Sequence, residues 1–341
     1  PYHGLMTMDI PQRPRRTRRT PAIRAMVAET RLDAGQLIYP LFLHDDPADV
    51  ALESLPGQTR WSLEGLVGEV GRALSLGVDK VVLFPKIDDE LKSALAEEAF
   101  NSEGLIPRAI RAIKAAHPGV CVVTDVALDP YSADGHDGLV NDEGVIENDA
   151  TVDVLVKQAL CHAEAGADIV APSDMMDGRV AAIRETLDAH GYAHVSIMAY
   201  TAKYASAYYG PFRGALDSAP KSSGNGGKII PGDKKTYQMD PANVREALRE
   251  VELDEDEGAD FVMVKPAGPY LDVVRAVREH THLPVAAYQV SGEYLMIKAA
   301  AASGGVDEKA VVMESLLGIR RAGADVILTY FAPQVAAWLA E

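Results

Sequence analysis

The sequence predicts an α/β protein built as a (β/α)8 barrel, the TIM-barrel architecture, with an extended N-terminal arm. From residue 36 onward, short β-rich runs alternate with amphipathic stretches to the end of the 341-residue chain. Such alternation indicates βαβ units and a parallel sheet. Eight units suit a closed barrel better than an open doubly wound sheet. No GxGxxG motif follows the first run, so a dinucleotide-binding fold has no support.

Residues 1–35 are predicted to be the arm, with one short helix at about 21–30, and residues 36–341 the barrel domain. Strands are predicted at 37–43, 80–84, 120–126, 169–171, 195–199, 261–264, 285–290 and 326–329. Helices are predicted at 63–76, 107–116, 152–165, 180–190, 242–256, 271–280 and 308–322. The longest irregular segment, at about 209–240, has a polar, glycine-rich middle and is typical of a loop that covers an active site.

Composition and charge exclude several kinds of partner. The net charge of −17 argues against nucleic acid or an anionic membrane as the main partner. No apolar run approaches the roughly 20 residues that span a bilayer. Cys121 and Cys161 cannot build a disulfide framework, and neither belongs to a CxxC pair. We therefore expect a cytoplasmic protein, with a plastid or similar compartment as the alternative.

A basic run near the start of the chain departs from this acidic balance. Five arginines lie between Arg13 and Arg19. We interpret the run as a solvated arm or an arm that contacts another subunit. The alternative is an arm that binds nucleic acid.

Reactive side chains gather where the predicted strands end, which is the edge at which TIM-barrel active sites form. In chain order, these side chains are Asp125, Asp129, Ser173, Asp174, Lys203, Lys265, Ser291 and Tyr330.

Two of these side chains are lysines at the ends of neighbouring strands. Lys265 follows Phe-Val-Met-Val and precedes a proline, so its neighbours offer little solvation. Burial and a second nearby ammonium both lower the pKa of an amine, and imine formation requires a neutral amine. One such lysine indicates a class I aldolase, whereas two indicate that two carbonyl substrates are held covalently. The alternative is that Lys203 and Lys265 form ion pairs with Asp125, Asp129 or Asp174.

Five segments carry a more specific signal: Ala-Pro-Ser-Asp-Met-Met-Asp-Gly-Arg at 171–179, Tyr-Thr-Ala-Lys-Tyr-Ala-Ser-Ala-Tyr-Tyr-Gly-Pro-Phe-Arg at 200–213, Gly-Asp-Lys-Lys-Thr-Tyr-Gln at 232–238, Val-Met-Val-Lys-Pro-Ala at 262–267 and Tyr-Gln-Val-Ser-Gly-Glu at 288–293. Together, and in this order, they resemble the porphobilinogen synthase family, also called 5-aminolaevulinate dehydratases. The resemblance runs from the basic arm to Tyr330.

The resemblance implies a hydro-lyase of tetrapyrrole biosynthesis that condenses two 5-aminolaevulinate molecules into porphobilinogen through lysine Schiff bases. It assigns Lys265 to the substrate that becomes the propionate side and Lys203 to the acetate-side substrate. It implies that Arg213 and Lys234 bind the acetate-side carboxylate, in charge-assisted hydrogen bonds. The other residues implied to bind substrate are Ser291 and Tyr330, for the propionate-side carboxylate, and Asp125, Ser173 and Gln238.

The loop after the third predicted strand concerns the metal. One branch of the family has three cysteines there that bind catalytic zinc, and the matching positions here are Ala127, Asp129 and Asp137. Alanine cannot be a ligand and carboxylates prefer harder ions, so we expect no catalytic zinc. Asp129 and Asp137 are expected to hold a monovalent cation, water or the substrate amino group, or to transfer protons, unless they only cap the loop. For this branch the resemblance implies an allosteric Mg²⁺ at Glu250.

The resemblance also implies a homo-octamer built from dimers. In one respect the chain differs from the family pattern, which has a shorter link where about nine residues are inserted here, within 222–231. Two other functions are alternatives for this sequence. A class I aldolase of another substrate needs only one lysine and a phosphate-binding glycine loop after strand seven or eight, which the sequence lacks. An RNA-binding scaffold predicts salt-sensitive binding and no need for Lys265.

Overall fold

The computed structural model describes residues 10–216, 219–220 and 228–341, and the chain divides into two compact units, Pro1–Arg31 and Leu32–Glu341. The first unit contains a 3-10 turn, η1 (Pro14–Arg18), and a short helix, α1 (Pro21–Met26). The Thr20 side chain accepts a hydrogen bond from the backbone N–H of Ile23 and caps this helix. The helix predicted near 21–30 is therefore present but shorter.

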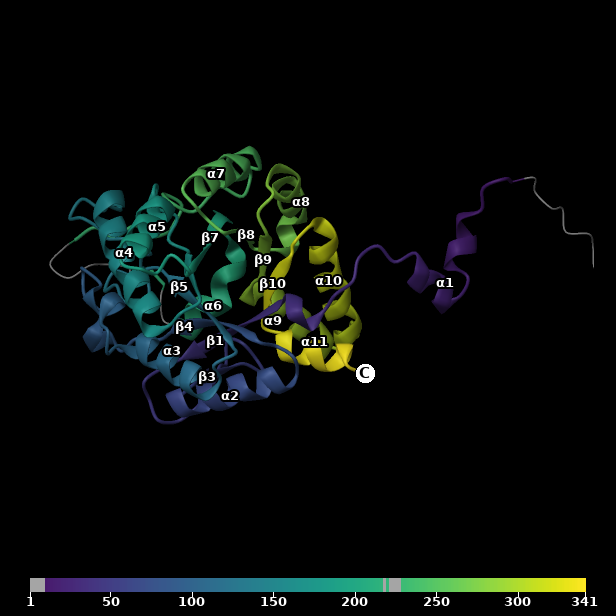
Figure 1. Cartoon of the computed structure of the whole chain (residues 1–341), viewed down its shortest axis with the longest axis horizontal. Helices are drawn as coiled ribbons and strands as arrows, with labels where there is room; N and C mark the ends of the chain where they lie inside the picture. The colour runs from purple at the N-terminus through teal and green to yellow at the C-terminus, as the bar shows by residue number, and fades with distance from the viewer. Residues whose placement is uncertain (1–9, 217–218, 221–227) are drawn as a thin grey trace, which may run out of the picture. The chain divides into compact units, whose positions relative to one another are not determined.

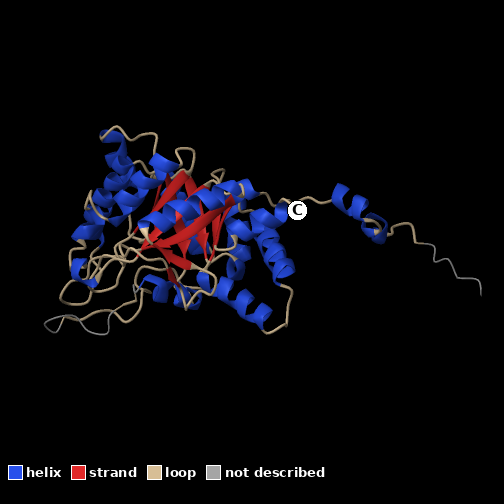
Figure 2. Ribbon diagram, turned by 90° about the horizontal axis from the view of Figure 1, so that it is seen from below, coloured by secondary structure: helices blue, strands red, loops and turns tan. Residues whose placement is uncertain are grey.

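Eight parallel strands of the second unit close into a barrel, which confirms the predicted fold class. They are β1 (Leu37–Leu43), β4 (Lys80–Pro85), β5 (Cys121–Val126), β6 (Ile169–Pro172), β7 (Ser196–Lys203), β8 (Phe261–Lys265), β9 (Val285–Gln289) and β10 (Val326–Thr329). Each strand pairs with the next, and β10 returns to β1 with Leu37 opposite Ile327. Figure 2 shows the strands at the centre of this unit with helices around them.

The helices around the barrel follow the predicted amphipathic stretches closely. They are α2 (Leu63–Ser75), α3 (Leu105–Ala116), α4 (Asn148–Ala165), α5 (Arg179–Ala189), α7 (Arg245–Asp256), α8 (Leu271–His280) and α10 (Glu308–Ala322), labelled in Figure 1. Five further elements were not predicted: α6 (Gly210–Leu216), α9 (Ser291–Ala302), α11 (Ala332–Leu339) and the short strands β2 (Val50–Ala51) and β3 (Thr59–Trp61).

Helix α6 corrects the prediction that residues 209–240 are irregular throughout. The segment begins helically, and its predicted insertion at 222–231 lies partly outside the described residues, which resume at Lys228. Among the described residues, no helix has the length and apolar character needed to cross a membrane.

The strand register determines where the reactive side chains lie. Every residue of β1 is buried, and the interior of the barrel is filled by aliphatic and aromatic side chains. In the pairing of β7 with β8, Lys203 lies opposite Lys265, at the last position of each strand. Strand β7 extends past its predicted end to Lys203, and its pairing with β8 has a register shift between Ala199 and Ala202. The two lysines therefore stand side by side at the carboxyl end of the barrel.

Candidate active site

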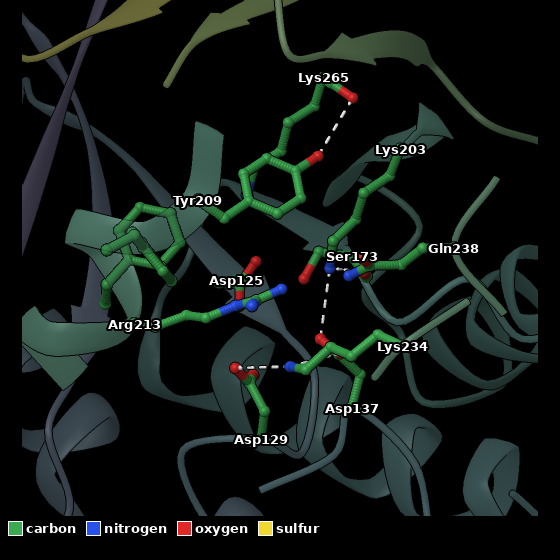
Figure 3. A pocket seen from close by; sticks show the side chains of 12 residues that line it. Asp125, Asp129, Asp137, Ser173, Lys203, Tyr209, Arg213, Lys234, Gln238 and Lys265 are labelled. Atoms are coloured by element: carbon green, nitrogen blue, oxygen red, sulfur yellow. Dashed lines mark hydrogen bonds and ion pairs between the residues drawn. The ribbon is translucent and has the colours of Figure 1, made fainter. Parts of the chain in front are cut away.

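A narrow cavity opens at the carboxyl ends of the strands (Figure 3). Its lining side chains are Phe84, Asp125, Asp129, Asp137, Ser173, Lys203, Tyr209, Phe212, Arg213, Lys234, Gln238 and Lys265. They leave a cavity volume of only about 30 Å³, enough for little more than ordered water. A substrate with several heavy atoms can enter only if some of these side chains or their loops move.

Lys265 is enclosed by aromatic rings. Its side chain is buried, and its Nζ lies 4.8–5.2 Å from the ring centroids of Tyr200, Tyr209, Phe212 and Tyr288. Burial, and after it the nearby Lys203 ammonium, lowers the pKa of Lys265 to about 7, although the Asp125, Asp137 and Asp129 carboxylates act in the opposite direction. Burial and the second ammonium are the two causes that the sequence predicted. At neutral pH a large share of the amine is therefore uncharged and able to act as a nucleophile.

Lys203 lies in a more polar part of the cavity. Its Nζ donates a hydrogen bond to the backbone carbonyl of Ser173 and lies 3.2 Å from Oδ1 of Asp137. The ion-pair alternative named three other aspartates, and in the structure Asp137 is the partner instead. Asp137 lies twelve residues after Asp125 in the chain, and nothing in the sequence around it indicates that it contacts Lys203.

Asp125, at the end of β5, is a carboxyl group able to exchange protons near neutral pH. Burial raises its pKa to about 7, although Lys203 and Lys265 act in the opposite direction. One of its oxygens, Oδ1, is buried and has no hydrogen-bond partner among the described residues. A buried carboxyl group with this pKa is suited to general acid–base catalysis.

Lys234 reaches the cavity from the segment after α6 and pairs with two aspartates. Its Nζ lies 3.3 Å from Oδ2 of Asp129 and 2.8 Å from Oδ2 of Asp137. Burial alone would raise the pKa of Asp137, but the Lys203 and Lys234 ammoniums outweigh it and hold the pKa below its usual range. The Tyr237 hydroxyl also donates to Asp137, at 2.9 Å. The two aspartates predicted to replace zinc ligands thus face ammonium groups.

Arg213 and Gln238 also line the cavity, whereas Ser291 and Tyr330 do not. Ser291 Oγ accepts a hydrogen bond from the backbone N–H of Phe212, at 3.0 Å. The Tyr330 hydroxyl lies 3.0 Å from the hydroxyl of Tyr288, one of the rings around Lys265. Both residues are buried directly behind the groups that form the cavity wall.

The aromatic residues of this enclosure were not predicted from the sequence. Tyr200, Tyr209 and Phe212 lie within the Lys203 motif itself, and Tyr288 begins the Ser291 motif. Their presence in these motifs was a usable signal. What the sequence did not reveal is that all of them face the amine of Lys265 rather than that of Lys203.

Glu250 lies on α7, away from this cavity. It lines a second cavity of about 450 Å³ together with Glu246 and Asp177. Burial raises the pKa of Glu250 to about 7, and the nearby Arg179 guanidinium opposes that rise. The neighbouring carboxylates Asp254, Asp177 and Glu246 contribute to the same rise.

Comparisons with known proteins give one consistent result. A family model described as delta-aminolevulinic acid dehydratase matches residues 11–338. The chain is 59% identical to the chloroplastic delta-aminolevulinic acid dehydratase of Physcomitrium patens, over 98% of this chain and 76% of that protein. It is 56% identical to the protein of the same name from Glycine max, over 97% and 78%. A solved structure of the Toxoplasma gondii enzyme with its product porphobilinogen is 55% identical, with a TM-score of 0.93 over 97% of this chain and 92% of that one.

Proposed function

The chain belongs to the delta-aminolevulinic acid dehydratase family, and from this premise we propose that it condenses two 5-aminolaevulinate molecules into porphobilinogen on Lys265 and Lys203. Such an enzyme is a hydro-lyase of tetrapyrrole biosynthesis. The observation that carries the proposal is the pair of lysines in one cavity, with Lys265 buried among four aromatic rings and its pKa near 7.

The first chemical step follows from the state of Lys265. Its neutral Nζ attacks the ketone carbon of one substrate, and the carbonyl oxygen takes up a proton. Loss of that oxygen as water leaves an imine between the substrate and Lys265. Asp125 lines the same cavity and can give or take a proton at neutral pH, because burial raises its pKa to about 7.

Lys203 holds the second substrate by the same chemistry. The amine reacts in its neutral form, and the Asp137 carboxylate, 3.2 Å away, orients it in the cavity. Arg213 and Lys234 provide two cations for the carboxylate of this acetate-side substrate. Lys234 must then exchange one of its aspartate partners for the substrate. Ser173 and Gln238 line the cavity beside it.

The propionate-side carboxylate is assigned to Ser291 and Tyr330. Both hydroxyls are engaged behind the cavity wall, with Phe212 and with Tyr288. This assignment therefore requires a local movement at the cavity wall that turns the Ser291 O–H, which donates to the Tyr208 carbonyl at 3.4 Å, toward the substrate carboxylate. The small free volume of the cavity requires a movement of this kind in any case.

We assign Mg²⁺ to Glu250 and no zinc to the catalytic cavity. Glu250, Glu246 and Asp177 supply carboxylate oxygens around one cavity, and such oxygens suit a hard ion that keeps most of its water ligands. Bound Mg²⁺ would supply positive charge that keeps Glu250 ionised.

At the zinc positions of the family's other branch, Ala127 offers no ligand atom. The carboxylates of Asp129 and Asp137 already face Lys234. A monovalent cation at these aspartates would have to compete with that ammonium.

We infer that the enzyme works as a homo-octamer built from dimers, in which the arginine-rich arm contacts a neighbouring copy. Support comes from charge: five arginines occur within Arg13–Arg19 of a chain whose net charge is −17. Binding of Mg²⁺ that is possible only in the larger assembly would favour that assembly. The chloroplastic names of the relatives favour a plastid over the cytoplasm.

Replacement of Lys265 by methionine tests the proposal. Lys265→Met removes the amine but keeps much of the apolar volume, so we expect turnover to fall by about 10³-fold or more. Lys235→Met is the matched control, because Lys235 lies next to Lys234 in the sequence but is 74% exposed at its side chain. Substantial turnover by Lys265→Met would show that the imine does not form on this residue.

A further inference from the structure

A carboxylate outside the cavity links the loops on either side of Lys265. Glu293 is the third residue of α9 and is 9% exposed. Its Oε2 accepts the N–H of Val290, the residue that follows β9, at 2.8 Å. Its Oε1 accepts the N–H of Gly268 at 2.8 Å, in the turn three residues after Lys265. One side chain therefore connects the end of β9 to the turn that follows β8.

The sequence around this carboxylate is arranged for close approach. A Cβ atom at Gly268 would lie 2.5 Å from Oε1 of Glu293, which is shorter than a van der Waals contact, so the carboxylate would have to shift. A Cβ atom at Gly292 would lie 2.5 Å from the backbone oxygen of Tyr208. Glycine at both positions lets the start of α9 contact the turn after β8 on one side and the segment before α6 on the other.

The second contact reaches the aromatic enclosure. Ser291 Oγ accepts the N–H of Phe212 at 3.0 Å and donates to the carbonyl of Tyr208 at 3.4 Å. The rings of Tyr209 and Phe212 lie 5.1 and 5.2 Å from Nζ of Lys265. The start of α9 thus holds both the backbone that follows the amine and two of the four rings around it.

We propose that Glu293 is a positioning residue for Lys265. The ionised carboxylate of Glu293 keeps the turn after β8 and the Tyr208–Phe212 segment in their positions around the amine. This inference rests on the proposed imine role of Lys265. An ionised carboxylate satisfies both N–H donors, whereas a protonated one presents its O–H to one of them. Protonation of Glu293 therefore loosens one of the two connections.

Solvent can reach Glu293 without passing through the active site. The carboxylate lines a cavity of about 370 Å³ that is also lined by Leu271 of α8 and Ser315 of α10. Burial raises the pKa of Glu293 to about 7, and its backbone N–H donors only partly offset that rise. The ionisable groups on the elements packed against α9 are Tyr208, Tyr209 and Arg213 on the side of α6, Tyr270 in the turn after β8, and Glu308, Lys309, Glu314, Arg320 and Arg321 on α10; of these, Glu314 and Arg321 line the cavity.

Two substitutions break the connection in different ways. Glu293→Gln replaces one acceptor oxygen by an amide that donates, and Gly268→Ala keeps the carboxylate but pushes it away. At pH 8 we expect each to slow single-turnover imine formation at Lys265 about tenfold, with KM nearly unchanged. The double variant should be no slower than either single one, because both remove the same contact. Glu69→Gln, at a buried carboxylate of α2 that pairs with Arg72, is the control expected to keep the wild-type rate.

The pH dependence separates positioning from a general loss of structure. Below pH 7 the wild-type carboxyl is itself protonated, so the ratio of wild-type to Glu293→Gln rates should fall from about ten toward one by about pH 5.5. A ratio that is independent of pH, or a wild-type rate in Gly268→Ala at pH 8, would overturn the inference. Gly268→Ala also decides the matter if Glu293→Gln does not fold. Label that never attaches to Lys265 in the wild type would instead overturn the proposed function.

Discussion

Replacement of Phe212 by alanine tests whether the aromatic enclosure keeps Lys265 neutral. Burial is the largest cause of the fall in the pKa of Lys265 from 10.5 to about 7. At about 1.36 kcal/mol per unit, that fall favours the neutral amine by roughly 5 kcal/mol. The Phe212 ring lies 5.2 Å from Nζ, and its removal admits water on one side. Because one of the four rings around the amine is then missing, we expect the pKa of Lys265 to rise by about one unit.

The expected kinetic effect follows from the neutral fraction of the amine. At pH 7 that fraction falls from about one half to about one tenth, so imine formation should slow roughly fivefold. At pH 9 most of the amine is neutral in both proteins, and the difference should nearly vanish. The assay is single-turnover trapping of labelled 5-aminolaevulinate by borohydride, at several values between about pH 6 and pH 9.

A matched control is available outside the cavity. Phe100→Ala removes another ring that faces a lysine, since Nζ of Lys157 lies 5.5 Å from the Phe100 centroid, but this lysine is not in the cavity. It should leave the trapping rate unchanged. If Phe212→Ala were slower by the same factor at every pH, the ring would act through packing alone, and the pKa argument would be refuted.

Three further predictions concern metal and assembly. A zinc-selective chelator should leave turnover intact, because Ala127, Asp129 and Asp137 occupy the positions of the zinc cysteines; activity that is lost and then restored stoichiometrically by zinc would contradict this. Glu250→Ala should weaken stimulation by Mg²⁺ in steady-state assays without abolishing imine trapping, and unchanged stimulation would remove Glu250 from the metal site. Deletion of residues 1–20 should give smaller oligomers of low activity by light scattering while the barrel stays folded by circular dichroism. A fully active large oligomer without these residues would exclude the arm from assembly.

The barrel was predictable because its local patterns agree with its packing. The bounds predicted for β1, β10, α8 and α10 are those observed, since each is a clear apolar run or amphipathic period between turn residues. Helix α9 was missed for a physical reason. It begins Ser-Gly-Glu and ends in four alanines, so it has neither a capping side chain at its N-cap nor an apolar stripe. Its tertiary contacts determine the helix there.

The active site was predictable only in part. Strand ends placed Lys203 and Lys265 at one edge, and the burial and charge arguments gave the direction of the pKa of Lys265 correctly. The partner of Lys203 was not predictable, because Asp137 reaches it from a loop whose path depends on long-range contacts. The position of Ser291 behind the wall likewise depends on α9, which the sequence did not reveal.

The central claim is that two lysines of one cavity each bind a substrate covalently. Borohydride trapping with labelled 5-aminolaevulinate, followed by peptide mapping, measures this directly. We predict label on the peptide that contains Lys265 at low substrate, and on the peptides of both Lys265 and Lys203 at saturating substrate. Label on Lys265 alone at every concentration would favour a one-lysine enzyme of the aldolase kind. Label on neither lysine would contradict the account.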